Sequence, residues 1–339
     1  MNFHAPARLF AFTVPIAARL AIPHNPAMPL PVVTNLPLPA IVETLLAGKV
    51  ELLPWSVAEQ GSPDVAGIYT YGHMHLDGAM LDRLPGVKVI SNYGVGVDHI
   101  DVPAARRRGI KVGNTPRVLD GAVADMTFAL LLASARGIVE GDRYARGPQF
   151  LKVDHSRSLG WEVHGMTLGI VGMGNIGVEV ARRAQGFDMT VLYHNRTRRP
   201  VEVERRVGAR FVGLDEILRQ SDYLVLNVPL NDSTRGLIGA KELSVMKPTA
   251  TLINIARGPV VDTGALTVAL QNRTIRAAGL DVTDPEPLPR EHPLLSMQNV
   301  TITPHLGSAT VQTRQKMAEI SVENLLRGLR GEALLHEVG

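Results

Sequence analysis

The sequence has no cysteine among its 339 residues, and aromatic residues make up only 4% of it. A chain without cysteine forms no disulfide, no thiolate nucleophile, no iron–sulfur cluster and no cysteine-based zinc site. A strong excess of either charge is also missing, because 35 basic residues against 32 acidic residues leave a net charge of +3. This balance argues against a protein dedicated to nucleic acid, so no nucleic-acid partner is expected.

Long apolar runs are missing as well. No stretch reaches the roughly 18 consecutive apolar residues that a membrane-spanning helix needs, so no membrane partner is predicted. With no cysteine to oxidise, the sequence fits a reducing compartment, and a cytoplasmic location is expected. The length predicts two domains at about 150 residues each. Apolar residues make up 45% of the chain, which is enough to fill two ordinary cores.

Residues 1–29 differ from the rest of the chain. The first acidic residue is Glu43, and prolines are concentrated in residues 1–39. The segment Leu9–Ala18 has the character of a weak secretory signal, but Pro15 interrupts it and the cleavage signal is poor. We therefore interpret residues 1–29 as a disordered N-terminal extension, with Met28 as an alternative start.

Apolar, β-branched runs alternate with segments of helical periodicity from Pro31 onward. Short buried strands that alternate with helices are typical of parallel sheets covered on both faces. The strongest helical pattern, around Val123–Ala135, stands between two groups of strands and is interpreted as their connection. The predicted strands are Pro31–Thr34, Val65–Tyr69, Val87–Ile90, Leu168–Val171, Thr190–Tyr193, Tyr223–Val228, Thr251–Asn254, Ala278–Val282 and Val300–Thr303.

A glycine-rich motif follows one of these strands and begins a helix. G-x-G-x-x-G is a weak signal alone, but here a buried strand precedes it and a strand–helix–strand unit encloses it. The first glycine permits a tight turn, the second lets the backbone approach a pyrophosphate, and the third lets helix and strand pack closely. The amides that follow would face the anion from the helix N-terminus. The residues predicted to bind a dinucleotide here are Gly172, Gly174, Asn175, Ile176 and Gly177.

The end of the next strand indicates which dinucleotide binds. An NAD site normally has a carboxylate about 20 residues after the glycines, whereas here none occurs before Glu202. Asn195, Arg196 and Thr197 can instead donate to a 2′-phosphate, Arg196 as a charged fork. A solvated basic turn is the alternative interpretation. The sequence thus favours NADP(H), with NAD(H) possible.

Three side chains at predicted strand ends can reduce a 2-oxo acid. Open α/β sheets bind their ligands at the carboxyl ends of strands, where Arg257, Glu286 and His305 are expected. Arg257 can clamp a carboxylate and polarise the carbonyl. His305 can donate a proton, and Glu286 can orient the imidazole and favour its charged form. Each could alone be an ordinary surface residue, but together beside a nucleotide loop they predict a catalytic trio.

At these residues the sequence resembles the D-isomer-specific 2-hydroxyacid dehydrogenase family, over nearly all of residues 30–335, and especially its glyoxylate/hydroxypyruvate reductase branch. The resemblance implies that Arg257, Glu286 and His305 are catalytic and that the substrate is a small 2-oxo acid. It also implies that the Val95 and Gly96 amides hold the substrate carboxylate. The stretches that carry it are Asn92–Asp98, Gly172–Gly177, Asn254–Val261, Ala278–Pro289 and Pro304–Thr310.

The resemblance further implies an α/β fold of two domains, each a doubly wound parallel sheet. A flavodoxin-like substrate-binding domain would take residues 30–119 and 311–339, and a Rossmann NAD(P)-binding domain residues 120–310. Family members are commonly homodimers, so a homodimer is expected. Asp281 is implied to contact the nicotinamide carboxamide. Further cofactor contacts are expected at Pro229, Thr234, Ile255, Ala256, His305 and Gly307, and further substrate contacts at Arg257, His305 and Ser308.

Other functions stay open at this point. Sugar-acid reductases of the 2-ketogluconate type share nearly all these motifs, so the motifs do not fix the substrate. A different class, an NAD(P)-sensing binding protein like the family's corepressors, would keep the trio without turnover. His73 and His75 form an H-x-H pair in an expected loop. A histidine pair in a loop without carboxylate or cysteine partners is usually incidental, so no metal site is predicted.

Overall fold

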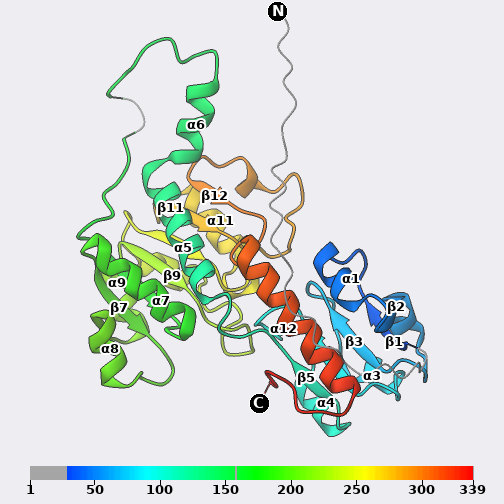
Figure 1. Ribbon diagram of the computed structural model, residues 1–339. Coiled ribbons are helices and arrows are strands. Elements are labelled where there is room, and N and C mark those ends of the chain that lie inside the picture. Colours follow the sequence, from blue (N-terminus) through cyan, green and yellow to red (C-terminus); the bar gives the residue numbers. More distant parts are fainter. Residues whose placement is uncertain (1–28, 157–158, 339) are drawn as a thin grey trace, which may run out of the picture.

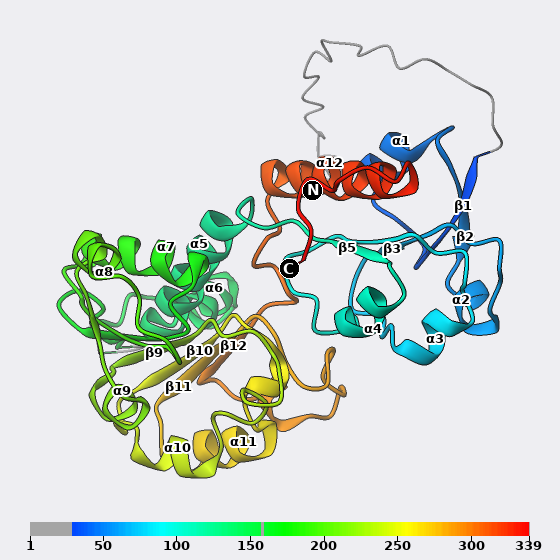
Figure 2. The ribbon, with the colours of Figure 1, turned by 90° about the horizontal axis from the view of Figure 1, so that it is seen from below.

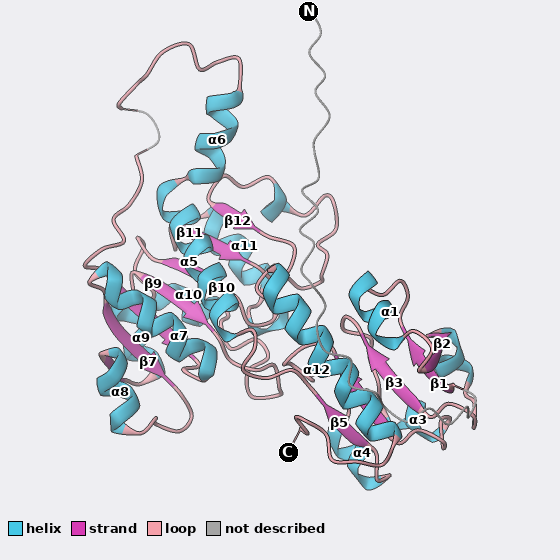
Figure 3. Ribbon diagram, in the orientation of Figure 1, coloured by secondary structure: helices cyan, strands magenta, loops and turns pink. Residues whose placement is uncertain are grey.

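The computed structural model describes residues 29–156 and 159–338, and almost all of the predicted N-terminal extension lies outside the described residues. Two parallel β-sheets stand side by side, each with helices on both faces (Figure 1; Figure 3). In Figure 2, α1 and α12 cover one face of the first sheet, and α2, α3 and α4 lie on the other. The predicted α/β architecture of two doubly wound parallel sheets is confirmed.

The first sheet has five strands in the order β2-β1-β3-β4-β5, which is the flavodoxin-like order. Its strands are β1 (Leu30–Thr34), β2 (Val50–Pro54), β3 (Gly67–Thr70), β4 (Val89–Asn92) and β5 (Lys111–Gly113). The helices packed on it are α1 (Ala40–Leu46), α2 (Ser56–Gln60), α3 (Gly78–Asp82), α4 (Val102–Arg107) and α12 (Val311–Leu329).

The second sheet has seven strands in the order β12-β11-β10-β9-β6-β7-β8. Its first strand in the chain, β6, lies between β7 and β9, so the strand order reverses there and a ligand crevice opens at that point. The strands are β6 (Thr167–Val171), β7 (Thr190–His194), β8 (Ala209–Phe211), β9 (Tyr223–Leu226), β10 (Thr251–Asn254), β11 (Ala277–Leu280) and β12 (Val300–Ile302). The helices are α5 (Asp120–Arg136), α6 (Ile138–Arg146), α7 (Asn175–Ala184), α8 (Val201–Val207), α9 (Leu214–Gln220), α10 (Ala240–Val245) and α11 (Thr263–Gln271), with 3-10 turns at Gln185–Phe187, Gly258–Val260 and Pro293–Leu295.

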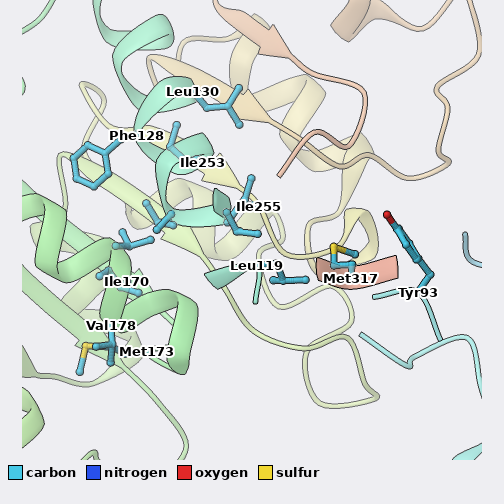
Figure 4. Packing of buried hydrophobic residues seen from close by; sticks show 14 of the residues in the cluster. Tyr93, Leu119, Phe128, Leu130, Ile170, Met173, Val178, Ile253, Ile255 and Met317 are labelled. Carbon is cyan, nitrogen blue, oxygen red and sulfur yellow. The ribbon is translucent and has the colours of Figure 1, made fainter. Parts of the chain in front are cut away.

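Two chain crossings join the sheets, one into α5 and one into α12. The helix α5 packs on the second sheet against α7 and β10, whereas α12 returns to pack on β3 and β4 of the first. One apolar cluster continues across the junction, through Leu119 before α5 and Met317 in α12 (Figure 4). Tyr93, after β4, belongs to the same cluster. The region between the two sheets is therefore supported by a continuous packed apolar core.

No single helix among the described residues is long and apolar enough to cross a membrane. The pair α5 and α6, bent by 62° at Gly137, meets that test by length and composition only. Seven residues of α5 are buried within the protein, whereas α6 has no buried residue.

Every predicted strand corresponds to an observed one, usually within two residues, and the predicted connecting helix is α5. Three observed strands were not predicted. They are β2, β5 and β8, and each lies at an edge of its sheet.

Candidate active site

His305 and Glu286 meet in the loops that follow two neighbouring strands. Glu286 lies beyond β11 and His305 beyond β12, and these strands pair in parallel. His305 Nδ1 lies 2.8 Å from Glu286 Oε1. Burial alone would raise the pKa of Glu286, but the hydrogen bond and charge of His305 outweigh it, so the net pKa lies below its ordinary value. The predicted pairing of acid and imidazole is thus geometrically in place, with Glu286 as the charged partner.

The His305 loop is fixed by Asp281, a buried residue that is 2% exposed. Its carboxylate accepts hydrogen bonds from the Leu306 amide at 2.7 Å, the Gly307 amide at 2.8 Å and the Thr303 hydroxyl at 2.6 Å. His305 itself has a φ of +55°, which is a costly conformation for a residue other than glycine. Asp281 therefore holds the predicted catalytic histidine in place. Its predicted contact with the nicotinamide carboxamide stays a prediction, since its oxygens already have these donors.

Arg257 follows β10 and points across to the first sheet. Its Nε donates to Asp98 Oδ1 at 3.0 Å, and Nη1 donates to the Ala256 carbonyl at 2.9 Å. The guanidinium also lies directly against Gly96, where a Cβ atom would overlap it. The Arg257 and Asp98 side chains are only 20% and 18% exposed. Asp98 therefore orients the predicted substrate clamp over the backbone that was predicted to bind the same carboxylate.

The backbone around Val95 and Gly96 is arranged as an anion site. Side-chain amides bind its carbonyls: Asn92 Nδ2 donates to Gly96 O at 2.9 Å, and Asn114 Nδ2 donates to Val95 O at 2.9 Å. Within the described part of the chain, the amides of Val95 and Gly96 have no acceptor. Successive free amides beside a guanidinium attract a carboxylate. This geometry agrees with the predicted role of these amides, and it adds Asn92 and Asn114 as their supports.

A cavity of about 340 Å³ brings these groups together between the two sheets. Val95, Gly96, Arg257, Glu286, His305 and Ser308 line it, as do the predicted cofactor residues Ile176, Ile255, Asp281 and Gly307. Arg314, in the first turn of α12, also lines the cavity, although it was not predicted as a site residue. Its guanidinium lies 5.7 Å from the Tyr93 ring centre, and it has no ion-pair partner among the described residues. The cavity is thus lined by a second positively charged side chain, Arg314, besides Arg257.

The glycine loop between β6 and α7 has room for a dinucleotide. Gly172 has a φ of +98°, and a Cβ there would lie 2.7 Å from the backbone of Asn227, so only glycine fits. A Cβ at Gly177 would lie 2.6 Å from the Gly172 carbonyl, which is the close helix–strand approach predicted for it. At Gly174 the corresponding space is open, and this residue lines a cavity of about 760 Å³. The first amides of α7, at Asn175 and beyond, have no acceptor within the helix.

The end of β7 is basic and faces the same cavity. Arg196 and Thr197 are exposed on its wall, and Arg196 has no ion-pair partner among the described residues. The buried carboxylate of Glu204 is held by Arg198 at 2.8 Å, and together with the Tyr193 hydroxyl this lowers the pKa of Glu204 to about 2. Arg199 also lines the cavity, although it was not predicted to bind the cofactor. Its buried Nε has no hydrogen-bond partner among the described residues.

Some of the other predicted cofactor residues line the cavity, and others hydrogen-bond to the backbone of the loops around it. Pro229 and Thr234 line the larger cavity, as predicted contacts should. Asn195 instead binds the glycine loop: its Oδ1 accepts from the Met173 amide at 2.6 Å and its Nδ2 faces the Met173 carbonyl. Ala256 lines neither cavity, and its amide and carbonyl are bound to Asn254 and Arg257. Direct contacts of Asn195 and Ala256 with the cofactor stay predictions, and both residues support the frame.

Two histidines and an aspartate gather beside the catalytic histidine. His73, in the loop after β3, stacks on His305 with ring centres 5.4 Å apart, and it meets His99 at 5.2 Å. The ligand atoms of His73, Asp98 and His99 lie within 4.8 Å of one another. Burial lowers the pKa of His99 to about 4 and also lowers the pKa of His73. His75 lies outside this group, so the H-x-H pair does not act as a unit.

Comparison with known proteins places the chain in a family. The model of the D-isomer specific 2-hydroxyacid dehydrogenase NAD-binding domain matches residues 128–307. A glyoxylate reductase of Pyrococcus furiosus is 46% identical over 273 residues, which are 79% of this chain and 81% of that protein. The chain belongs to the D-isomer-specific 2-hydroxyacid dehydrogenase family. It is accordingly an oxidoreductase of 2-hydroxy and 2-oxo acids that works with a nicotinamide cofactor.

Solved structures agree with this assignment. The chain is similar to an NADPH-dependent glyoxylate/hydroxypyruvate reductase of Sinorhizobium meliloti, in complex with NADP and malonate. The TM-score is 0.84 at 34% identity, over 92% of this chain and 97% of that one. A glyoxylate reductase from Paecilomyes thermophila gives a TM-score of 0.80 at 34% identity, over 92% and 99%.

Proposed function

We propose that the protein reduces small 2-oxo acids, glyoxylate and hydroxypyruvate first among them, with NADPH as the preferred hydride donor. The observation that carries this proposal is the convergence in one cavity of Arg257, the Glu286–His305 pair and two free backbone amides. Hydride reduction of a ketone needs a cation at the oxygen and a proton for the developing alkoxide. The cavity offers both within reach of a carboxylate bound at Val95 and Gly96.

Each side chain has a distinct task in this reaction. The Val95 and Gly96 amides and the Arg257 guanidinium hold the substrate carboxylate, and Arg257 polarises the carbonyl. His305 donates its proton from Nε2, because Nδ1 is bound to Glu286. Glu286 stabilises the protonated ring before the transfer. NADPH, when bound, supplies the hydride to the carbonyl carbon.

The glycine loop and the end of β7 would hold the cofactor. The open space over Gly174 and the first amides of α7 would hold the pyrophosphate. Arg196, Thr197 and Arg199 would hold the 2′-phosphate, since all three line this cavity and Arg198 already neutralises the buried Glu204. The unpartnered Nε of Arg199 supports this, because a buried guanidinium atom requires an acceptor. NADH lacks the 2′-phosphate and binds more weakly.

A panel of 2-oxo acids tests the proposal. Glyoxylate, hydroxypyruvate, pyruvate and 2-ketogluconate are each added with NADPH and with NADH, and loss of absorbance at 340 nm is followed. We expect the highest kcat/KM for glyoxylate or hydroxypyruvate with NADPH. A preference for 2-ketogluconate would transfer the assignment to sugar-acid reduction. No turnover with any of the acids would refute the proposal and favour a cofactor-sensing binding protein.

The domain division and the oligomer belong to the same proposal. Residues 30–119 with 311–339 form the substrate-binding domain, and residues 120–310 form the nucleotide-binding domain. The protein is a homodimer that pairs through the nucleotide-binding domain. Support comes from apolar side chains exposed on α6 and the segment after it, a region that projects from the molecule in Figure 1. They are Ile138, Val139, Phe150, Leu151, Val153, Leu159 and Trp161. Light scattering of the purified chain measures the mass directly.

A further inference from the structure

We propose that His73, Asp98 and His99 form a binding site for a divalent transition-metal ion such as Zn²⁺, and that its occupation inhibits the enzyme. The three residues come from loops after β3 and β4, which are paired parallel strands whose ends Thr70 and Asn92 are in register. Their side chains therefore meet beyond the carboxyl ends of these two strands of the first sheet. This inference goes beyond the reduction reaction, and its binding half does not depend on it.

The donor set matches the chemistry of such an ion. Two imidazoles and one carboxylate are ligands that Zn²⁺ and its neighbours in the first transition row accept readily. The candidate ligand atoms lie within 4.8 Å of one another. Metal–ligand bonds of about 2.0–2.2 Å in a tetrahedral site place ligands roughly 3.3 Å apart, so the ligand atoms need to approach one another by up to about 1.5 Å. The Asp98 side chain is 18% exposed and held by Arg257, so the exposed His73 would make most of that adjustment by rotation.

His99 supplies an independent reason to expect a ligand. It is 6% exposed, and neither ring nitrogen has a hydrogen-bond partner among the described residues. Buried polar atoms are almost always paired, so an unpartnered buried imidazole marks a place where a partner is missing. Its ring meets the His73 ring edge to face, with ring centres 5.2 Å apart. A metal ion would satisfy one of these nitrogens.

Occupation would inhibit through two contacts with the catalytic groups. Asp98 is the acceptor for Arg257 Nε at 3.0 Å, so an ion that takes this carboxylate competes with the guanidinium that clamps the substrate. The added positive charge would also repel Arg257 from its position over Gly96. His73 lines the substrate cavity and stacks on His305, so a ligated His73 narrows the approach to the proton donor. The substrate and the ion therefore exclude one another.

The test measures binding and inhibition separately on the untagged, chelator-treated protein. Isothermal titration with Zn²⁺ and the visible absorption of added Co²⁺ report binding without turnover. The variants are His73→Gln and His99→Gln, and His75→Gln is the matched control because it removes an exposed histidine two residues from the site. We expect one ion per chain in the wild type and in His75→Gln. His73→Gln should bind more than about 100-fold more weakly, beyond the 10- to 100-fold that loss of an outer partner costs.

Inhibition is then read from oxo-acid reduction across the same Zn²⁺ concentrations. The wild type and His75→Gln should lose activity with a midpoint that equals the measured Kd at substrate concentrations well below KM and that rises as substrate is added. A chelator should restore the activity, whereas His73→Gln should keep the rate that it shows without Zn²⁺. His73→Gln keeps the test valid if the buried His99→Gln variant does not fold. Absence of binding at millimolar Zn²⁺, or equal affinity in His73→Gln and the wild type, would overturn the site. Binding without inhibition would overturn the regulatory part alone.

Discussion

Replacement of Glu286 by glutamine tests how the proton donor is prepared. The variant keeps a side chain of the same shape 2.8 Å from His305 Nδ1 but removes the negative charge. A hydrogen bond to a charged partner is worth about 1.5–3 kcal/mol, against about 0.5–1.5 kcal/mol for a neutral one. The two ranges differ by about 1–1.5 kcal/mol. The His305 and Glu286 side chains are 32% and 39% exposed, so solvent screens part of this difference and about 1 kcal/mol remains.

This difference predicts a kcat for glyoxylate reduction about fivefold below the wild type, since about 1.4 kcal/mol would be a factor of ten. KM for the oxo acid should change little, because the groups proposed to bind the substrate carboxylate, Arg257 and the amides of Val95 and Gly96, are unchanged. The assay is NADPH oxidation at 340 nm under saturating cofactor. The exposed neighbour Glu291, changed to glutamine, is the control. A kcat within twofold of the wild type, or a raised KM at full kcat, would refute the positioning role of Glu286.

Three further perturbations address the clamp, the cofactor and the pH dependence of stability. Gly96→Ala places a Cβ on the Arg257 guanidinium, so kcat/KM for the oxo acid should fall by about 10- to 100-fold in steady-state kinetics, and an unchanged value would show that the guanidinium moves freely. Arg196→Ala removes a charged donor, so KM for NADPH should rise about tenfold or more while KM for NADH stays constant; equal effects on both would exclude a 2′-phosphate contact. The pKa of Glu204 is lowered from 4.5 to about 2, so its charged form stabilises the fold above pH 4.5 and this contribution is lost as the pH falls toward 2. Urea unfolding of Glu204→Gln should show a deficit at pH 7 that shrinks between pH 4.5 and pH 2, and a constant deficit would contradict the assigned pKa.

The strands that sequence patterns missed have a common physical reason. The central strands of both sheets are buried on both faces, so they consist of continuous apolar runs that are easily recognised. The missed strands β2, β5 and β8 are the edge strands of their sheets. An edge strand pairs with a neighbouring strand on one side only, and it tolerates polar residues. Glu51, Lys111 and Arg210 interrupt their apolar runs. Strands β5 and β8 are also only three residues long.

The site residues that directly follow a strand could be predicted from the sequence. The contacts between loops of the two different sheets could not. Arg257, Glu286 and His305 each follow a recognisable strand, so their convergence could be inferred. Asp98 binds Arg257 across 159 positions of sequence, and no local spacing encodes that contact. The position of Arg314 in the cavity likewise depends on how the last helix returns to the first sheet.

The approach of His73 to His99 could have been anticipated in part. Both follow β3 and β4, and the carboxyl ends of neighbouring parallel strands share one edge of a sheet. The obvious H-x-H pair pointed instead to His75, which lies outside the cluster. The informative pattern was the placement of Asp98 and His99 after the next strand, rather than the spacing of the histidines.

The central claim is that His305 donates the proton when a 2-oxo acid is reduced in the cavity between the two sheets. The most direct measurement is kcat for glyoxylate reduction by NADPH in the wild type and in His305→Ala. The account predicts measurable turnover in the wild type and a loss of about 100- to 10,000-fold in the variant. A His305→Ala protein that turns over at the wild-type rate would contradict it.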